Sequence, residues 1–235
     1  MSAATMQSSS FREQKREQRM EKISRLGLPV YSLGEEICNA LSHGIGMLLG
    51  VAQLVIMLVF CRKDPLTVVS VSVYGASMIL LYLISTLYHS LGLNRAKKVF
   101  RVLDHCTIYL LIAGTYTPMT LLTMPNTTGI LLLSFVWTMA VLGIVLNAVN
   151  MKRFKVFSMV CYLGMGWSVV FVLPTLLPVL NTMEFAFLLA GGIFYTVGAV
   201  LYALGKKHAY VHFIWHLFVL AGSISHFLVV LSVAS

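Results

Sequence analysis

The chain alternates between long apolar stretches and short polar gaps. An α-helix needs about 20 mostly apolar residues to cross the hydrocarbon core of a bilayer. Seven stretches are long enough, at residues 37–60, 66–90, 103–123, 129–149, 156–177, 184–204 and 212–234. Because the gaps between them are short, consecutive helices must run antiparallel. The pattern predicts an all-α membrane protein in which residues 33–235 form a bundle of seven transmembrane helices. A transmembrane β-barrel would need alternating segments of about ten residues, which the sequence lacks.

Turn residues and composition agree with this interpretation. The segment MPNTTG at 124–129 is expected to end the third helix, and Pro174 and Pro178 to end the fifth. Hydrophobic residues make up 58% of the chain and charged residues only 11%. A soluble domain carries about 25% charged residues. The charged fraction is therefore too small to cover the surface of a soluble protein of this size.

Residues 1–32 form a separate, polar and basic segment. Six of its residues are Lys or Arg, and Met20, Ile23 and Leu26 recur at helical spacing. We expect a cytoplasmic tail that contains a short amphipathic helix on the membrane surface, where a protein partner could dock. The first apolar stretch starts too late and is too long for a secretory signal.

The basic residues predict the orientation. All Lys and Arg residues except Arg62 and Lys63 fall in the tail or in the second, fourth and sixth gaps. By the positive-inside rule, the N-terminus is cytoplasmic and, after seven crossings, the C-terminus is outside. We expect a multi-pass protein of the plasma membrane. The net charge of +9 is then topological, and it does not indicate a nucleic-acid partner.

Ionisable side chains inside membrane spans are costly and by default mark a functional site. Four of the predicted helices carry polar residues close to their cytoplasmic ends. These residues are Glu36, Asn39 and His43 in the first helix, Ser85 and His89 in the second, Asp104 and His105 in the third, and His212 and His216 in the seventh. Their common depth predicts one polar site near the cytoplasmic face.

The histidines favour a metal. The four-residue spacing of His212 and His216 lets one helix offer two imidazoles to one ion. His89 would complete the three-ligand set with one open position that is typical of catalytic zinc. Asp104 could act as general base or orient a ligand, and Ser85 could position water or an oxyanion. Two interfacial histidines that meet lipid headgroups are the alternative for the pair alone.

Other residues contribute less to this site. Glu36, Asn39 and His43 suit an interhelical hydrogen-bond network better than metal ligation. His226 follows His216 by ten residues, about 15 Å along the axis, so it is too deep for the same ion. The four cysteines are scattered, which excludes a disulfide framework or a thiolate zinc pattern. Imidazole ligands leave iron, cobalt and nickel open beside zinc.

Four motifs resemble the hemolysin III family, the bacterial relatives of the adiponectin and progestin receptors. They are EEICNALSHGIG (35–46), STLYHS (85–90), DHCTIYLLIAGTYTP (104–118) and HFIWHLFVLAGSISHF (212–227). The wider group includes the alkaline ceramidases and shares Ser-x-x-x-His, a later Asp and a final His-x-x-x-His. These positions match Ser85, His89, Asp104, His212 and His216. The resemblance implies that the three histidines bind Zn²⁺ near the cytoplasmic face, that the aspartate lies close to a zinc-bound water, and that the N-terminus is cytoplasmic.

Three functions fit these observations. The first is a zinc-dependent intramembrane hydrolase that acts on a lipid amide or ester. The second is a receptor-like sensor or regulator of membrane lipids in which zinc only stabilises the fold. A transporter or channel fits less well, because the polar groups gather at one end of the helices. The sequence does not decide between hydrolase and sensor, and it identifies neither the lipid nor the oligomeric state.

Overall fold

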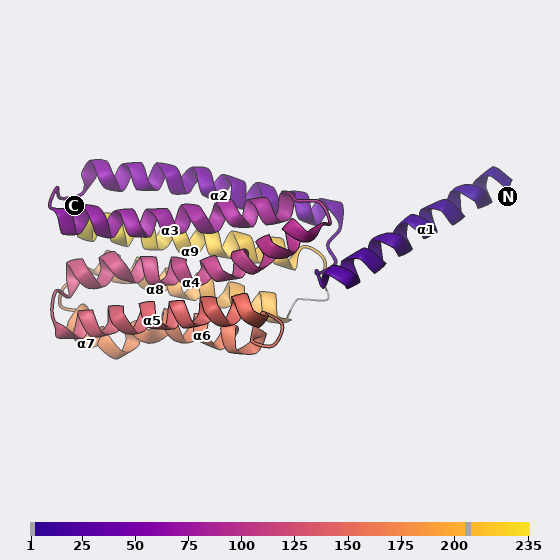
Figure 1. The fold of residues 1–235 in the computed structure, drawn as a ribbon. Helices are drawn as coiled ribbons and strands as arrows, with labels where there is room; N and C mark the ends of the chain where they lie inside the picture. Colours follow the sequence, from indigo (N-terminus) through magenta and orange to yellow (C-terminus); the bar gives the residue numbers. More distant parts are fainter. Residues whose placement is uncertain (1–2, 205–207) are drawn as a thin grey trace.

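The computed structural model describes residues 3–204 and 208–235, so that Lys206 and Lys207 of the orientation argument lie outside the described residues. Seven helical segments of the described chain are long and apolar enough to cross a membrane, which confirms the predicted all-α seven-helix architecture. A further helix, α1, precedes them (Figure 1). The elements are α1 (Ala3–Leu26), α2 (Leu33–Phe60), α3 (Pro65–Ser90), α4 (Arg95–Thr123), α5 (Thr127–Asn150), α6 (Lys155–Trp167), the 3₁₀ helix η1 (Ser168–Val172), α7 (Leu173–Leu176), α8 (Thr182–Leu204) and α9 (Val211–Ala234).

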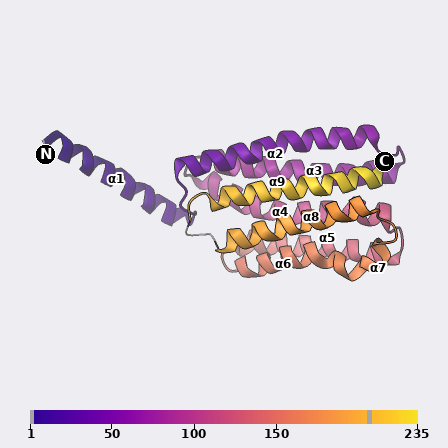
Figure 2. The ribbon, with the colours of Figure 1, turned by 180° about the vertical axis from the view of Figure 1, so that it is seen from behind.

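The helices form a closed bundle. Each spanning segment contacts the next along the chain, and α9 packs against both α8 and α2, which closes the ring. Helix α9 also contacts α3 and α4. Figure 2 shows α9 lying between α2 and α8, with the C-terminus at the end of the bundle opposite α1. The elements that carry the polar residues, α2, α3, α4 and α9, are therefore neighbours in space.

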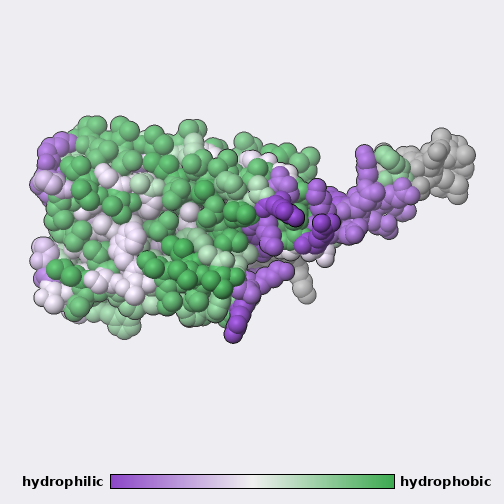
Figure 3. All heavy atoms as spheres, in the orientation of Figure 1, coloured by the Kyte–Doolittle hydropathy of each residue, from purple (hydrophilic) through white to green (hydrophobic). Residues whose placement is uncertain are grey.

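The surface matches a bilayer environment. Apolar residues cover the side of the bundle, and hydrophilic residues gather on α1 and at the adjoining end (Figure 3). Large aliphatic side chains such as Leu41, Val59 and Val149 are more than half exposed. On a soluble monomer an apolar surface this extensive would be an association site, whereas lipid covers it in a membrane. Which end of the bundle faces the cytoplasm remains a prediction from the charges.

Capping residues explain where the helices begin. Ser32 accepts a hydrogen bond from the Glu35 backbone, and the Glu35 carboxylate accepts one from Ser32 N, so α2 starts earlier than residue 37. Asn94 accepts a hydrogen bond from Lys97 N at 2.9 Å and starts α4 well before residue 103. The second cap matters for the site, because it places Lys97 in the first turn of α4. The hydrophobic pattern had placed this residue in the gap before the helix.

The fifth span is less regular than expected. It consists of α6, η1 and α7, and it changes to 3₁₀ geometry after Trp167. Pro174 lies in α7, the last turn of the span, which ends at Leu176, and Pro178 lies in the turn that follows. Proline has no N–H to donate and its ring crowds the carbonyl of the residue four positions earlier. Pro174 therefore cannot donate an α-helical hydrogen bond to the carbonyl of Val170, which lies in η1.

Helix α1 is longer than the short amphipathic helix expected within the tail. Met20 is exposed, whereas Ile23 is buried and packs with Leu28 and Tyr88 where α1 meets the bundle. The three apolar residues therefore do not form one lipid-facing stripe. The rest of α1 extends away from the bundle in Figure 1.

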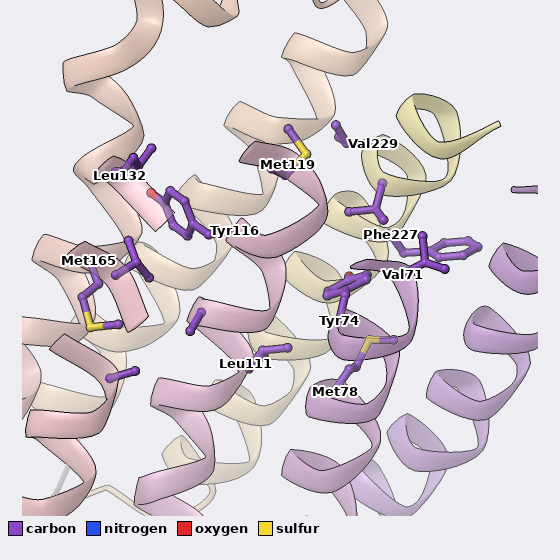
Figure 4. Close-up of a cluster of buried hydrophobic side chains, with 14 of the residues drawn as sticks. Val71, Tyr74, Met78, Leu111, Tyr116, Met119, Leu132, Met165, Phe227 and Val229 are labelled. Carbon is purple, nitrogen blue, oxygen red and sulfur yellow. The ribbon is translucent and has the colours of Figure 1, made fainter. Parts of the chain in front are cut away.

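The interior of the bundle is packed with aromatic, sulfur-containing and branched side chains. Figure 4 shows Tyr74 and Met78 of α3, Leu111 and Tyr116 of α4, and Phe227 of α9 within this cluster. This core fills the interior of the bundle. The polar site lies at the end of the bundle nearest α1.

Candidate metal centre

Three histidines from two helices meet at one point. His212 and His216 lie one turn apart at the start of α9, and His89 lies in the last turn of α3. The Nε2 atom of His212 is 3.2 Å from that of His89 and 3.2 Å from that of His216. The three potential ligand atoms all lie within 4.8 Å of one another. The cluster is thus compact enough to hold one metal ion, although it does not identify the metal.

The hydrogen bonds of the rings show which nitrogen atoms face the cluster as acceptors. His89 Nδ1 lies 2.7 Å from Glu36 Oε2, and a carboxylate can only accept, so Nδ1 carries the proton. His216 Nδ1 lies 3.2 Å from the carbonyl oxygen of Asn39, and donation to this oxygen places the proton on the same ring nitrogen. Both rings therefore direct an Nε2 lone pair toward His212. A proton on His212 Nε2 could form a hydrogen bond with only one of these two lone pairs.

This arrangement fits a cation. Tetrahedral zinc with Zn–N bonds of about 2.0–2.1 Å separates its nitrogen ligands by about 3.3 Å. The observed separations of 3.2 Å are close to that value. The backing of two ligand rings by a carboxylate and a carbonyl is also usual for metal-binding histidines.

Asp104 and Ser85 lie on the wall of a cavity that also reaches His212 and His216. The cavity has a volume of about 410 Å³, and apolar atoms form most of its surface although polar and basic side chains also line it. Ser85 Oγ is buried and has no hydrogen-bond partner among the described residues. Asp104 Oδ2 lies 3.9 Å from His105 Nδ1. Asp104 and Ser85 are thus outside the three-histidine cluster but face the same interior space.

The polar residues of α2 divide into two groups. Glu36 accepts an interhelical hydrogen bond from His89 Nδ1 at 2.7 Å, and the side-chain amide of Asn39 lies 3.4 Å from the same nitrogen, in the interhelical network that the sequence favoured. His43 does not join this network. Both of its ring nitrogens are buried without a hydrogen-bond partner in the described part of the chain, and its ring stacks on that of His216.

Two residues near the cluster were not singled out in the sequence. Tyr31, in the segment between α1 and α2, stacks on His212 with ring centroids 5.3 Å apart and contacts His89 edge-on. Burial raises the pKa of Tyr31 well above its usual range, so the phenol stays neutral. Lys97 was counted only as a topological charge, yet its side chain is buried and lies 2.9 Å from Glu36. Their proximity depends on tertiary packing, which no local pattern reveals.

His226 agrees with its expected depth. Its Nε2 lies 3.2 Å from the carbonyl oxygen of Leu188 in α8, and its ring contacts Tyr195. It is therefore a packed, hydrogen-bonded residue within the bundle and is not a member of the three-histidine cluster.

A comparison with known protein families shows to which family the chain belongs. The Haemolysin-III related family matches residues 31–227, which include all five candidate site residues. The chain belongs to the Haemolysin-III related family. It is 44% identical to Hemolysin-3 of Bacillus cereus over 213 residues, which are 90% of this chain and 95% of the relative. It is 42% identical to the Hemolysin-3 homolog of Bacillus subtilis (strain 168) over 204 residues, 86% of this chain and 95% of the relative.

A human protein is also similar to this member of the Haemolysin-III related family. Monocyte to macrophage differentiation factor of Homo sapiens is 28% identical over 160 residues, which are 66% of each chain. The family match begins at residue 31, so it leaves out α1 but includes Tyr31 and all of α2.

Proposed function

We propose that this protein is a zinc-dependent membrane hydrolase that cleaves an amide or ester bond of a lipid. The observation that carries the proposal is the convergence of three imidazole nitrogens, two of them from residues that line a cavity of about 410 Å³ inside a membrane-type bundle. A purely structural zinc site usually has four protein ligands, whereas a catalytic one has three and an open position. Access to a cavity therefore favours the catalytic reading.

His89, His212 and His216 would hold the metal through Nε2. Three neutral imidazoles and no thiolate suit zinc. Bound zinc would polarise a substrate carbonyl and lower the pKa of a coordinated water to about 7. Asp104 would accept the proton of the attacking water and pass it to the amine or alcohol that leaves as the C–N or C–O bond breaks. Ser85 would hydrogen-bond to the water or to the carbonyl oxygen as negative charge develops there.

The cavity wall supports a lipid as the substrate. Leu81, Ile108, Ile112 and Leu163 line the same space as Asp104. Sites for small molecules combine apolar walls with placed polar groups, and this wall also carries the basic side chains Arg101, Lys152 and Lys155. An acyl chain can lie along the apolar wall while its polar linkage meets the histidines and Asp104.

The test begins with the metal content of the detergent-purified protein. We expect about one zinc per chain in the wild type and in Asp104→Asn, and loss of zinc in His89→Ala and in His212→Ala/His216→Ala. His208→Ala is the matched control, because His208 is exposed. An absence of metal in the wild type, even after reconstitution with zinc, would overturn the proposal.

Turnover is then measured on a lipid amide and a lipid ester that carry the same fluorescent acyl chain. We expect cleavage of at least one of them, abolished by chelation, and about 10²- to 10⁴-fold slower in Asp104→Asn with its zinc retained. A zinc-loaded protein in which Asp104→Asn and wild type give the same rate would exclude the role of Asp104. If the zinc-loaded wild type cleaves neither substrate, a zinc-stabilised sensor becomes the better explanation.

A further inference from the structure

The helix α2 contributes no ligand to the three-histidine cluster, yet its residues contact two of the three rings. Glu36 lies 2.7 Å from His89 Nδ1, and the backbone oxygen of Asn39 lies 3.2 Å from His216 Nδ1. Ser42 Oγ, also on α2, lies 3.0 Å from His216 Nδ1. Because an imidazole can rotate about two side-chain bonds, a partner on its far nitrogen fixes both the tautomer and the ring plane.

The partner of His89 is itself held by a buried lysine. Lys97 Nζ lies 2.9 Å from Glu36 Oε1, while Glu36 Oε2 contacts His89, so the carboxylate bridges the two. The side chain of Lys97 is 3% exposed and that of His89 is 0% exposed. A buried ammonium group is costly unless it is paired and hydrogen-bonded. The Glu36 carboxylate provides this pairing for Lys97.

The remaining contacts of Lys97 fix it to the end of the helix that carries His89. Its Nζ donates to the carbonyl oxygens of Tyr88 and Leu91, both at 3.0 Å. The last carbonyls of a helix lack intrahelical donors, and a cation there also complements the helix dipole. The lysine thus joins the first turn of α4 to the last turn of α3 and to α2. It also lies over the ring of Tyr88.

We propose that Lys97 and Glu36 form a positioning relay that sets the metal affinity of the cluster by holding His89 in its ligating orientation. Lys97 acts on the His89 ring through Glu36, which it holds against the ring. Glu36 acts only through His89. Neither residue is a ligand or a catalytic residue. The inference rests on the proposed metal site, and it adds that the first turns of α2 and α4 determine how well that site binds.

Cobalt binding tests the relay, because Co²⁺ in a nitrogen-ligand site gives a visible absorption spectrum that reports ligand geometry. The purified full-length wild type, Glu36→Gln, Lys97→Met and the double variant are titrated with Co²⁺, and the bound Co²⁺ is then displaced with Zn²⁺. We expect each single variant to bind Co²⁺ about 10- to 100-fold more weakly than the wild type, with an altered spectrum. In the Glu36→Gln background, Lys97→Met should cause little further loss.

Two matched controls separate this role from charge alone. Glu35→Gln changes the neighbouring carboxylate, which contacts the backbone of Ser32 and Tyr210 and no histidine. Lys98→Met removes the neighbouring lysine, which is exposed. Both should keep the wild-type spectrum and affinity.

The relay is overturned if Lys97→Met lowers the unfolding temperature of the metal-free protein but leaves the Co²⁺ spectrum and affinity unchanged. It is also overturned if Lys97→Met weakens Co²⁺ binding equally with and without Glu36. If Lys97→Met does not fold, Glu36→Gln decides, and an unchanged spectrum in that variant rejects the relay. Failure of the wild type itself to bind metal would reject the proposed function, whereas a metal-binding wild type with unaffected variants rejects only the relay.

Discussion

His43 lies face to face on His216, with ring centroids 3.5 Å apart and the ring planes 9° from parallel. It is buried and borders the interior cavity, and its other ring neighbour, Tyr82, meets it edge-on. Because no described residue forms a hydrogen bond to its nitrogens, the His43 ring contributes to the packing around His216 through its flat shape.

Replacement of His43 by Phe should therefore leave the metal content near one ion per chain, whereas His216→Phe should abolish it. Phe keeps a flat ring of similar size, and replacing a buried polar group that has no partner costs little. His43→Ala should unfold more easily by roughly 2–4 kcal/mol, because it leaves a cavity beside His216. Metal analysis and thermal unfolding in detergent check both expectations. Loss of metal in His43→Phe would mean that His43 is itself a ligand.

Removal of the metal should destabilise the bundle. The cluster joins α3 to α9 through side chains only, so an ion held by His89 and His212 cross-links two helices that are far apart in sequence. At a free zinc concentration about 1,000 times Kd, the stabilisation is about 4 kcal/mol. A chelator should lower the unfolding temperature of the wild type and have no effect on His212→Ala/His216→Ala. An equal response of the two proteins would show that the chelator acts elsewhere.

The seven helices follow from the sequence because each signal is local. Twenty apolar residues and a cap such as Ser32 or Asn94 lie within one short window of the chain. The depth of the histidines is equally local, since His89 and His212 each lie close to a helix end. What the sequence could not supply is the identity of neighbours: that α2 lies against α9, and that Lys97 turns inward.

Lys97 shows this limit most clearly. Its neighbours Arg95 and Lys98 are exposed, and the three residues look alike in a basic gap. Only the start of α4 at Arg95 and the packing of α2 against α3 bring Glu36 within reach of one of them. The same applies to His43, whose stacking on His216 depends on the contact between α2 and α9.

The adjacent glycines of α8 should respond differently to the same substitution. A Cβ on Gly191 would collide with the ring of His226, whereas a Cβ on Gly192 would meet Trp167 at an ordinary 3.8 Å. Gly191→Ala should therefore destabilise the protein by about 1–3 kcal/mol, since the buried histidine must move. Gly192→Ala is the control and should be neutral or slightly stabilising, because Ala favours helix. Thermal unfolding measures the difference, and equal values for the two variants would mean that His226 yields freely.

The orientation predicted from the charges can be tested at two positions at opposite ends of the bundle. The four native cysteines are replaced by Ala or Ser, and one cysteine is then introduced at Gly92 or at Ser235. Gly92 lies between α3 and α4, where an added Cβ meets nothing within 4 Å, and Ser235 is the exposed last residue. The basic residues near Gly92 should stay cytoplasmic. A membrane-impermeant maleimide should therefore label Ser235→Cys in intact cells and Gly92→Cys only after permeabilisation, with the cysteine-free parent as the blank. The opposite labelling would place the three-histidine cluster at the outer face, and a lipid substrate would then have to be sought in the outer leaflet.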